Sequence, residues 1–487
     1  SARGSREPRA EEYLRGDNKY MAAGPHGGCE FFLGRRRCGF RIAGSIRPVT
    51  AKVPGMPRKT NTGAARFQHA QRNQIEWQPF ALDDLVEQDH VVRLVWAYTA
   101  SLDLSELYAR IKAVEGQPGR DPIDPRILLA LWLYATIDGI GTARKLARLC
   151  QEHVAYRWLC GGVSVNYHTL SDFRSNQAEF LDKLLTQSVA VLLHQGLVEL
   201  NHISQDGMKV RASAGSSSFR RKPTLERCLK EAQAQVEALK READEDPSAG
   251  ERRIRAARER AAREREQRLE QALAEREQLA AKQEDREKGS GEKARCSSTD
   301  PEARIMKMGD GGFRPAYNVQ LATADGSRVI TGVEVTNAGT DGGQMQPMVE
   351  QHLWRYGEQP QDWKADGSFV NLTDITDLGQ SGITVYLPLM ELKRQLAAGR
   401  NPYAPKPGDS PEVRAWRARM STPEAQAIYA QRASTAEFSN AGFRNRGLYQ
   451  FVVRGLKKVK AVALLQALAH NFQRTIALRR AADLPLV

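Results

Sequence analysis

Two spacings of apolar residues divide the chain. From Ile75 to about Ala178, apolar side chains recur at the intervals that place them on one side of a helix. From about Val198 onward, short runs alternate apolar and polar positions, which is typical of β-strands. The pattern predicts an all-helical domain over residues 75–190 and an α/β domain over residues 191–487.

The helical region contains two segments that suit contact with phosphate. The basic run TARKLARLC follows a pair of glycines, and Thr142 is placed to cap its helix. Further along, VNYHTLSDFRS places Thr169 or Ser171 at the start of a helix that carries Arg174. Hydroxyl groups and an arginine near a helix N-terminus favour binding of an anion. A packed helical bundle with capped ends is the alternative interpretation.

Strand patterns in the second region predict a mixed sheet. VELNHISQDGMKVRA forms a strand that ends at Asp206, and AYNVQLATADGSRVITGVEV forms two strands around a tight turn at Asp325-Gly326. A fourth strand ends at Asp366, and ITVYLPL forms a fifth after an intervening helix. Three strands, a helix, a strand, a helix, a strand and closing helices are the order of an RNase H-like mixed sheet. The predicted fold class is α/β.

A charged insertion interrupts this sheet at about residues 224–295. It is rich in Glu, Arg, Ala, Gln and Lys, which favour helix, and a break near residue 248 predicts two antiparallel helices. Leu269, Leu273 and Leu279 could form a thin apolar seam, but no heptad repeat persists. The insertion is either a solvated charged arm or a clamp on DNA or on a partner subunit.

Charge points to a polyanionic partner. The 487 residues carry a formal net charge of +14, which favours nucleic acid, although acidic membranes would also attract such a chain. No apolar run approaches the ~18 residues that span a bilayer, so no membrane association is expected. The six cysteines form no CxxC pair, which predicts a reducing cytoplasm and neither disulfides nor a zinc site.

The N-terminal extension, residues 1–74, is expected to be disordered or poorly ordered. Its first 55 residues are rich in Arg and Gly and lack the apolar core of a signal peptide. Met56 opens a more ordinary protein start, and we hypothesise that the stretch before it is an over-extended reading frame. Peptides from residues 22–55 in mass spectra of natively expressed protein would exclude this.

Acidic residues at strand ends are the candidate catalytic groups. Cleavage of a phosphodiester needs charge stabilisation that two divalent cations can supply, and hard cations prefer carboxylate oxygens. Asp206 and Asp366 are each followed by glycine at a predicted strand end. An Asp-Gly pair is also a common turn, as at Asp325. Among other acids, Asp341 is expected to cap a helix and Asp362 to lie in a loop.

Several segments together resemble bacterial insertion-sequence transposases of the DDE class. NYHTLSDFR resembles their N-terminal domain, and SQDGMKVRASAGSSSFRR resembles their first-aspartate block. RIMKMGDGGFRPAYNVQLAT and VEVTNAGTDGG resemble the following hairpin, and KADGSF resembles the second-aspartate block. Within the class, the group of insertion sequences numbered eleven eighty-two is the most similar. The resemblance implies a DNA transposase that cleaves DNA and transfers strands, with Asp206 and Asp366 as catalytic metal ligands.

The third acid follows from a helical signature of related transposases, written as Tyr, two residues, Arg, three residues, Glu, six residues, Lys. This chain offers Tyr429, Arg432 and Glu437, with four residues before the glutamate and with Arg444 at the lysine position. Glu437 is therefore the implied third metal ligand. An amphipathic helix with solvated charges is the alternative interpretation.

The resemblance also implies two Mg²⁺ ions, with Mn²⁺ as a substitute, and a homodimer or higher assembly on DNA. Its DNA partners would be the element's terminal inverted repeats and the target, in the nucleoid of a bacterial cytoplasm. The residues expected to contact DNA are Arg174, Lys209, Arg211, Tyr429, Arg432 and Arg444. Two rival functions remain open: a stand-alone RNase H-like nuclease, and a transposase-derived DNA-binding protein without catalysis.

Overall fold

The computed structural model describes residues 79–113, 121–245 and 252–486. The extension predicted at residues 1–74 lies outside them. The helical region begins with the 3₁₀-helix η1 and comprises seven α-helices within the described residues. Their bounds are η1 Leu82–Leu85, α1 Val91–Ser101, α2 Ser105–Ala109, α3 Pro125–Ile137, α4 Ala143–Glu152, α5 Val154–Cys160, α6 Tyr167–Asn176 and α7 Ala178–His194.

Side-chain caps set where these helices begin. The Thr142 hydroxyl accepts from the Lys145 amide at 3.4 Å, which confirms the predicted cap of α4. The prediction for α6 is wrong, because Asn166 caps it by accepting from the Thr169 amide at 3.0 Å. Thr169 and Ser171 instead lie within the helix. Asparagine caps as well as a hydroxyl residue does, so the helix begins earlier than predicted.

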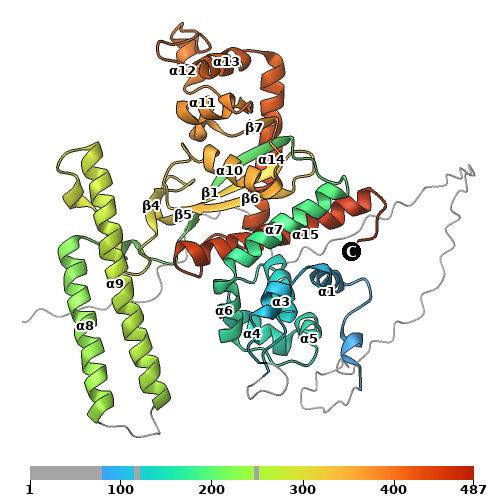
Figure 1. The fold of residues 1–487 in the computed structure, drawn as a ribbon, viewed down its shortest axis with the longest axis vertical. Coiled ribbons are helices and arrows are strands. Elements are labelled where there is room, and N and C mark those ends of the chain that lie inside the picture. Colours follow the sequence, from blue (N-terminus) through green and yellow to red (C-terminus); the bar gives the residue numbers. More distant parts are fainter. Residues whose placement is uncertain (1–78, 114–120, 246–251, 487) are drawn as a thin grey trace, which may run out of the picture. The chain divides into compact units, whose positions relative to one another are not determined.

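A six-stranded mixed sheet follows the helical region (Figure 1). Its strands run in the order β4-β5-β1-β7-β8, and β6 also pairs with β5. The pairs β1–β5, β4–β5 and β5–β6 are antiparallel, whereas β1–β7 and β7–β8 are parallel. Strand bounds are β1 His202–Arg211, β4 Arg304–Lys307, β5 Phe313–Ala324, β6 Ile330–Thr336, β7 Asp362–Lys364 and β8 Thr384–Tyr386. Gly326, with φ 71°, turns the chain between β5 and β6, as predicted.

Helices cover both faces of the sheet. Met208 and Val210 of β1 belong to the apolar cluster that contains α15, whereas Ile203 and Trp363 belong to the cluster that contains α10 and α11. This alternation of side chains gives the α/β class predicted from the sequence. The remaining bounds are α10 Met345–Tyr356, η5 Gly367–Phe369, α11 Leu372–Gln380, α12 Leu392–Ala397, α13 Pro411–Arg419, α14 Pro423–Asn445 and α15 Leu456–Ala481.

The C-terminal helix α15 joins the helical region to the sheet. It packs against α3, α6 and α7 on one side and against β6 on the other, and Figure 1 shows it beside α7. Most of its length from Val459 to Phe472 is buried. One apolar cluster therefore runs from α1 through α15 into β5 and β6.

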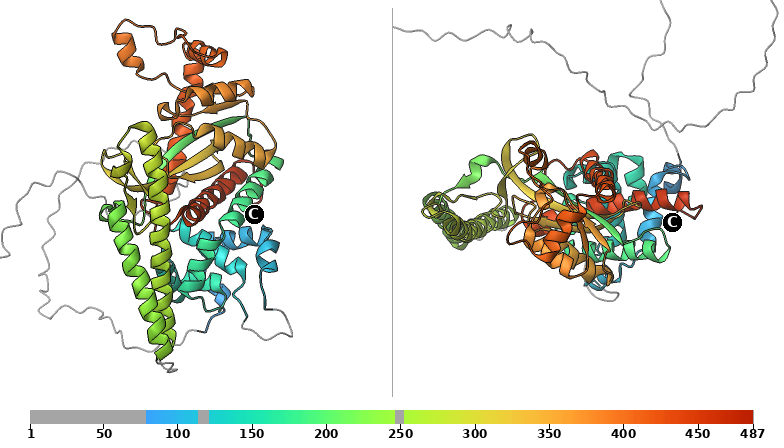
Figure 2. Two further views of the ribbon diagram at one scale, coloured as in Figure 1. Left: turned by 60° about the vertical axis from the view of Figure 1, so that its left-hand side comes forward. Right: turned by 90° about the horizontal axis from the view of Figure 1, so that it is seen from above.

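The charged insertion forms two long helices, α8 Lys222–Glu245 and α9 Arg252–Arg286, which lie side by side (Figure 2). The antiparallel strands β2 Phe219–Arg220 and β3 Cys296–Ser297 bring the entry and exit of the insertion together. The short 3₁₀-helices η2 Ser216–Ser218 and η4 Gly291–Lys293 flank them. Two helices were predicted, and their junction near residue 248 lies outside the described residues. A thin apolar seam includes Leu269, which is 1% exposed.

A buried charge network holds the start of β1 to β7. The Lys364 side chain, 2% exposed, pairs with Asp325 at 2.8 Å and with Asp362. Asp362 also contacts His202 Nδ1. Asp362 is the first residue of β7, so its placement in a loop was wrong.

Lys364→Ala is expected to destabilise the fold by about 3–5 kcal/mol, because two largely buried carboxylates would lose their cation. Denaturant unfolding at neutral pH measures this. The exposed Lys393→Ala variant is the control and should change stability by less than about 0.5 kcal/mol. Equal stabilities of the two variants would show that the network contributes nothing.

Two further properties concern only the described residues. No helix among them is both long enough and apolar enough to cross a membrane. Cys150, Cys160, Cys228 and Cys296 are free thiols.

Candidate active site

Asp206 lies on the central strand β1, at a position where one side of the strand has no pairing partner. The prediction placed it at the end of its strand, but it is the fifth residue of the ten-residue β1. The strand extends to Arg211 because β5 pairs with it throughout, whereas β7 pairs only with His202 to Ser204. Asp206 therefore follows the last pairing with β7, where one edge of β1 is free.

Helix α14 covers Asp206 from one face of the sheet. Asn440 Nδ2 donates to Asp206 Oδ2 at 2.8 Å, and Arg432 Nη1 lies 3.9 Å from Asp206 Oδ1. The buried Arg432 Nη1 and Asn440 Oδ1 have no hydrogen-bond partner. The helix starts where the Thr422 hydroxyl accepts from the Ala425 amide at 3.2 Å, with Pro423 as its first residue. This start sets which residues of α14 face Asp206.

Asp366 follows β7, the neighbouring parallel strand. Its carboxylate caps η5, accepting from the Ser368 amide at 2.8 Å and from the Ser368 hydroxyl at 2.6 Å. The same hydroxyl lies 3.0 Å from Asp341 Oδ2. A hydroxyl has one proton and can donate to only one of these carboxylates at a time. The other carboxylate is left with charge that a cation would neutralise.

Asp341 lies beside the two predicted aspartates, a position that the sequence did not predict. It was expected to cap a helix, but α10 begins after Gln344 without a side-chain cap. Asp341 Oδ1 instead accepts from Asn318 at 2.6 Å and from Gln320 at 2.9 Å, both on β5. Its place shortly after a strand, like that of Asp366, was the available signal.

The position of Asp341 explains why residue 207 is a glycine. A side-chain carbon at Gly207 would overlap the Asp341 carboxylate and the Gln320 amide. The missing side chain at this position therefore leaves the space that the Asp341 carboxylate occupies.

The carboxylate of Asp206 is costly to ionise in the absence of metal. Burial raises the pKa of Asp206 to about 6, with smaller contributions from the negative charges of Asp366 and Asp341. The positive charge of Arg432 acts in the opposite direction. The aspartates are thus close enough to repel one another electrostatically, as carboxylates that share a cation do before it binds.

Asp206→Asn is expected to stabilise the metal-free protein at pH ~7 by roughly 1–3 kcal/mol, since a raised carboxyl pKa disfavours the folded state once the group ionises. The contribution of Asp206 to stability is fully present below its unfolded pKa of ~4 and is lost as the pH rises through about 6. Thermal unfolding of both proteins in EDTA across this range measures the effect. A difference that does not vary with pH would contradict it.

Glu437 does not join the aspartates in this structure. It is an exposed residue of α14 without a hydrogen-bond or ion-pair partner, three positions before Asn440. Residues 79–113, 121–245 and 252–486 contain no cluster of three His, Cys, Asp or Glu side chains arranged to hold a metal ion. The structure therefore brings Asp206 and Asp366 together and leaves Glu437 at the margin of the helix face that contacts Asp206.

Three of the predicted DNA-contacting residues gather beside the aspartates. Lys209, Arg211 and Arg444 line a cavity of about 510 Å³ together with Arg314 and Tyr449. Lys209 and Arg211 continue β1 beyond Asp206, and Arg444 comes from the last turn of α14. The cavity is thus basic and adjacent to the candidate site.

The other predicted DNA contacts have different surroundings. Arg174 is 5% exposed, donates to the Gly141 carbonyl and lies over the Trp132 ring at 4.5 Å. Tyr429 packs against the apolar cluster on the α10 side of the sheet. Arg432 faces Asp206.

Two family models match the chain. Residues 80–176 match the Transposase domain (DUF772), and residues 408–476 match the Transposase DDE domain. The chain is an insertion-sequence DNA transposase of the DDE type. Searches of curated proteins and of solved structures gave no match.

The matched regions cover both ends of the described transposase. The first spans η1 to α6 and includes Arg174. The second spans α13, α14 and most of α15, so it contains Arg432, Glu437 and Asn440. Asp206 and Asp366 lie between the two matches, and their assignment depends on the geometry described above.

Proposed function

We propose that this transposase cleaves and joins DNA at a two-metal site formed by Asp206, Asp366 and Glu437. The observation that carries the proposal is the adjacency of two carboxylates, one on β1 and one just after the neighbouring parallel strand β7, with a helix of the matched DDE domain packed against Asp206. Their oxygens are the donors that Mg²⁺ and Mn²⁺ prefer. The Ser368 hydroxyl can donate to Asp366 or to Asp341 but not to both at once, so negative charge remains there for a cation to neutralise.

Divalent cations at such a site would activate the attacking oxygen and stabilise charge at the scissile phosphate. The protein's own residues would supply the positioning. Asn440 fixes one oxygen of Asp206, and Ser368 fixes one oxygen of Asp366. Arg432, which is not hydrogen-bonded through Nη1, is free to contact a phosphate that reaches Asp206. Glu437 would turn inward from its exposed position to complete the ligand set.

An RNase H-like catalytic core is supported by the strand order. The core strands lie side by side in the order β6-β5-β1-β7-β8. The first three of these strands along the chain, β1, β5 and β6, thus appear in reverse order, and β7 and β8 follow on the other side of β1. The first three are antiparallel and the last two are parallel to β1. We assign residues 191–487 to this catalytic domain, and the motifs favour the group numbered eleven eighty-two.

DNA would lie along the basic cavity beside the site. Lys209, Arg211 and Arg444 would hold the backbone so that a phosphate reaches Asp206. Residues 75–190 would recognise the terminal inverted repeats. Helix α4 supports this role because Arg144, Lys145 and Arg148 are exposed on it. We further propose a homodimer or higher assembly on DNA, in the bacterial nucleoid.

The function is tested with purified protein, Mg²⁺ and duplexes that carry the element's own ends. We expect cleavage at the ends followed by covalent joining of the freed 3′ hydroxyl to target DNA, and loss of both in EDTA. Cleavage without joining would identify the rival nuclease. Specific DNA binding without metal-dependent cleavage would identify the rival non-catalytic protein.

A further inference from the structure

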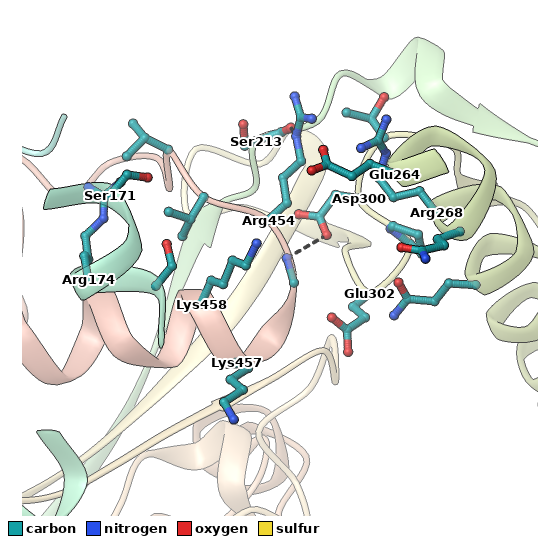
Figure 3. Close-up of a pocket in the computed structure, with 18 residues that line it drawn as sticks. Ser171, Arg174, Ser213, Glu264, Arg268, Asp300, Glu302, Arg454, Lys457 and Lys458 are labelled. Atoms are coloured by element: carbon teal, nitrogen blue, oxygen red, sulfur yellow. Dashed lines mark hydrogen bonds between the residues drawn. The ribbon is translucent and has the colours of Figure 1, made fainter. Parts of the chain in front are cut away.

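A second basic cavity lies apart from the candidate active site. It has a volume of about 670 Å³ and opens between α6, α9, the loop before β4 and the segment that leads into α15 (Figure 3). The charged insertion thus contributes one wall, and the segments around the sheet contribute another. Arg268 of α9 and Arg454 and Lys458 near the start of α15 all line it.

Two of the three acidic residues that line this cavity accept hydrogen bonds from other segments, whereas the third, Glu264 of α9, is exposed and unpaired. Asp300 Oδ1 accepts from the Tyr317 hydroxyl at 2.7 Å and from the Gly455 amide at 3.1 Å. Glu302 Oε2 accepts from the Leu456 amide at 2.9 Å. These two carboxylates satisfy the Gly455 and Leu456 amides at the start of α15, and their negative charge opposes binding of an anion at that helix terminus. The other oxygen of Asp300, Oδ2, is buried without a hydrogen bond.

Three of the basic side chains that line the cavity form no ion pair. Arg454 donates through Nε to the Ser213 carbonyl at 3.2 Å, but its terminal nitrogens form no ion pair. Arg268 Nε is buried without a hydrogen bond. Lys458 is exposed and unpaired, whereas the neighbouring Lys457 pairs with Glu179 at 2.9 Å.

The two guanidinium groups repel each other. The pKa of Arg268 is lowered, first by burial and then by the positive charge of Arg454, and only Glu264 acts in the opposite direction. Two like charges on separate chain segments, with free donors, destabilise the site until an anion binds between them. Arginine matches phosphate oxygens with paired donors, which makes phosphate the fitting anion.

We propose that this cavity binds a backbone phosphate of DNA between Arg268 of the insertion and Arg454 and Lys458 of the main body. The charged insertion is then a DNA-holding arm, and its contact is independent of sequence because it addresses phosphate alone. This cavity lies outside the aspartate cluster, so it adds a DNA contact at a distance from the point of cleavage. The proposal needs only that the substrate is DNA.

The test measures DNA affinity of the full chain by fluorescence anisotropy in EDTA. Arg268→Ala and Arg454→Ala are compared with Arg260→Ala, an exposed residue of α9 that does not line the cavity. We expect each cavity variant to bind about 5- to 30-fold more weakly, on specific and random duplexes alike. Each should also reduce the slope of log affinity against log salt by about one. Arg260→Ala should change affinity by less than about 2-fold, and Arg268→Lys should retain part of the affinity.

Equal weakening by Arg268→Ala and Arg260→Ala would overturn the proposal, since only general charge would then matter. Unchanged affinity combined with an altered oligomeric mass would also overturn it, by assigning the arm to a partner subunit. Because binding in EDTA needs no catalysis, an Asp206→Asn protein should show the same arginine dependence. Failure of cleavage and failure of this site are therefore distinguishable.

Discussion

Asp206→Asn and Asp366→Asn are each expected to lower the rate of Mg²⁺-dependent cleavage by at least about 10³-fold, because each removes a charged oxygen ligand from the proposed metal site. DNA binding in EDTA should be unchanged or slightly tighter, since each variant carries less negative charge near the phosphate path. Single-turnover cleavage of labelled duplexes bearing the element's ends measures the rate.

Asp377→Asn provides the matched control, because Asp377 is an exposed aspartate of α11 outside the site. It should cleave at the rate of the unmodified transposase. Substantial cleavage by either site variant would refute the assignment of that aspartate. A joint loss of cleavage and of DNA binding would instead indicate a damaged fold, which the thermal unfolding measurement detects.

Glu437→Gln is expected to lower cleavage by about 10²-fold or more, because two cations held by only two carboxylates would bind weakly. The residue is exposed and unpaired on the helix that contacts Asp206, so its side chain is free to turn toward a bound cation. Cleavage measured against Mg²⁺ concentration should show a higher metal requirement in the variant than in the unmodified protein.

Glu424→Gln, an exposed change in the first turn of the same helix, controls for the loss of one negative charge. Asp341→Asn is the informative comparison. If Glu437→Gln cleaves normally and Asp341→Asn does not, then Asp341 is the third ligand, and the irregular spacing of the helical signature has pointed to the wrong acid.

Local patterns predicted the elements whose geometry is decided locally. The hairpin of β5 and β6 follows from alternation of side chains and a turn at Asp325-Gly326, and it is confirmed. The cap at Thr142 follows from one hydroxyl and one amide three residues apart. At α6, two nearby hydroxyls were chosen although Asn166 was equally suitable, so the boundary was wrong.

The candidate site depends on contacts between residues far apart in the chain, which local sequence patterns do not predict. The length of β1 beyond Asp206 is set by pairing with β5, more than a hundred residues later in the chain. Asp341 reaches the site through Asn318, Gln320 and Ser368, which come from other elements. Helical periodicity placed Glu437 on α14, but the orientation of that helix over the sheet decides which side chain meets Asp206.

The central position of α15 has a consequence for synthesis on the ribosome. Chains emerge N-terminus first, and early segments begin to fold before later ones appear. Here the apolar surfaces of α3, α7 and β6 are covered by a helix that follows all three in the chain. A nascent or prematurely terminated chain would expose those surfaces and invite aggregation or degradation. Fragments that contain Asp206 and Asp366 but lack α15 are therefore expected to be unstable.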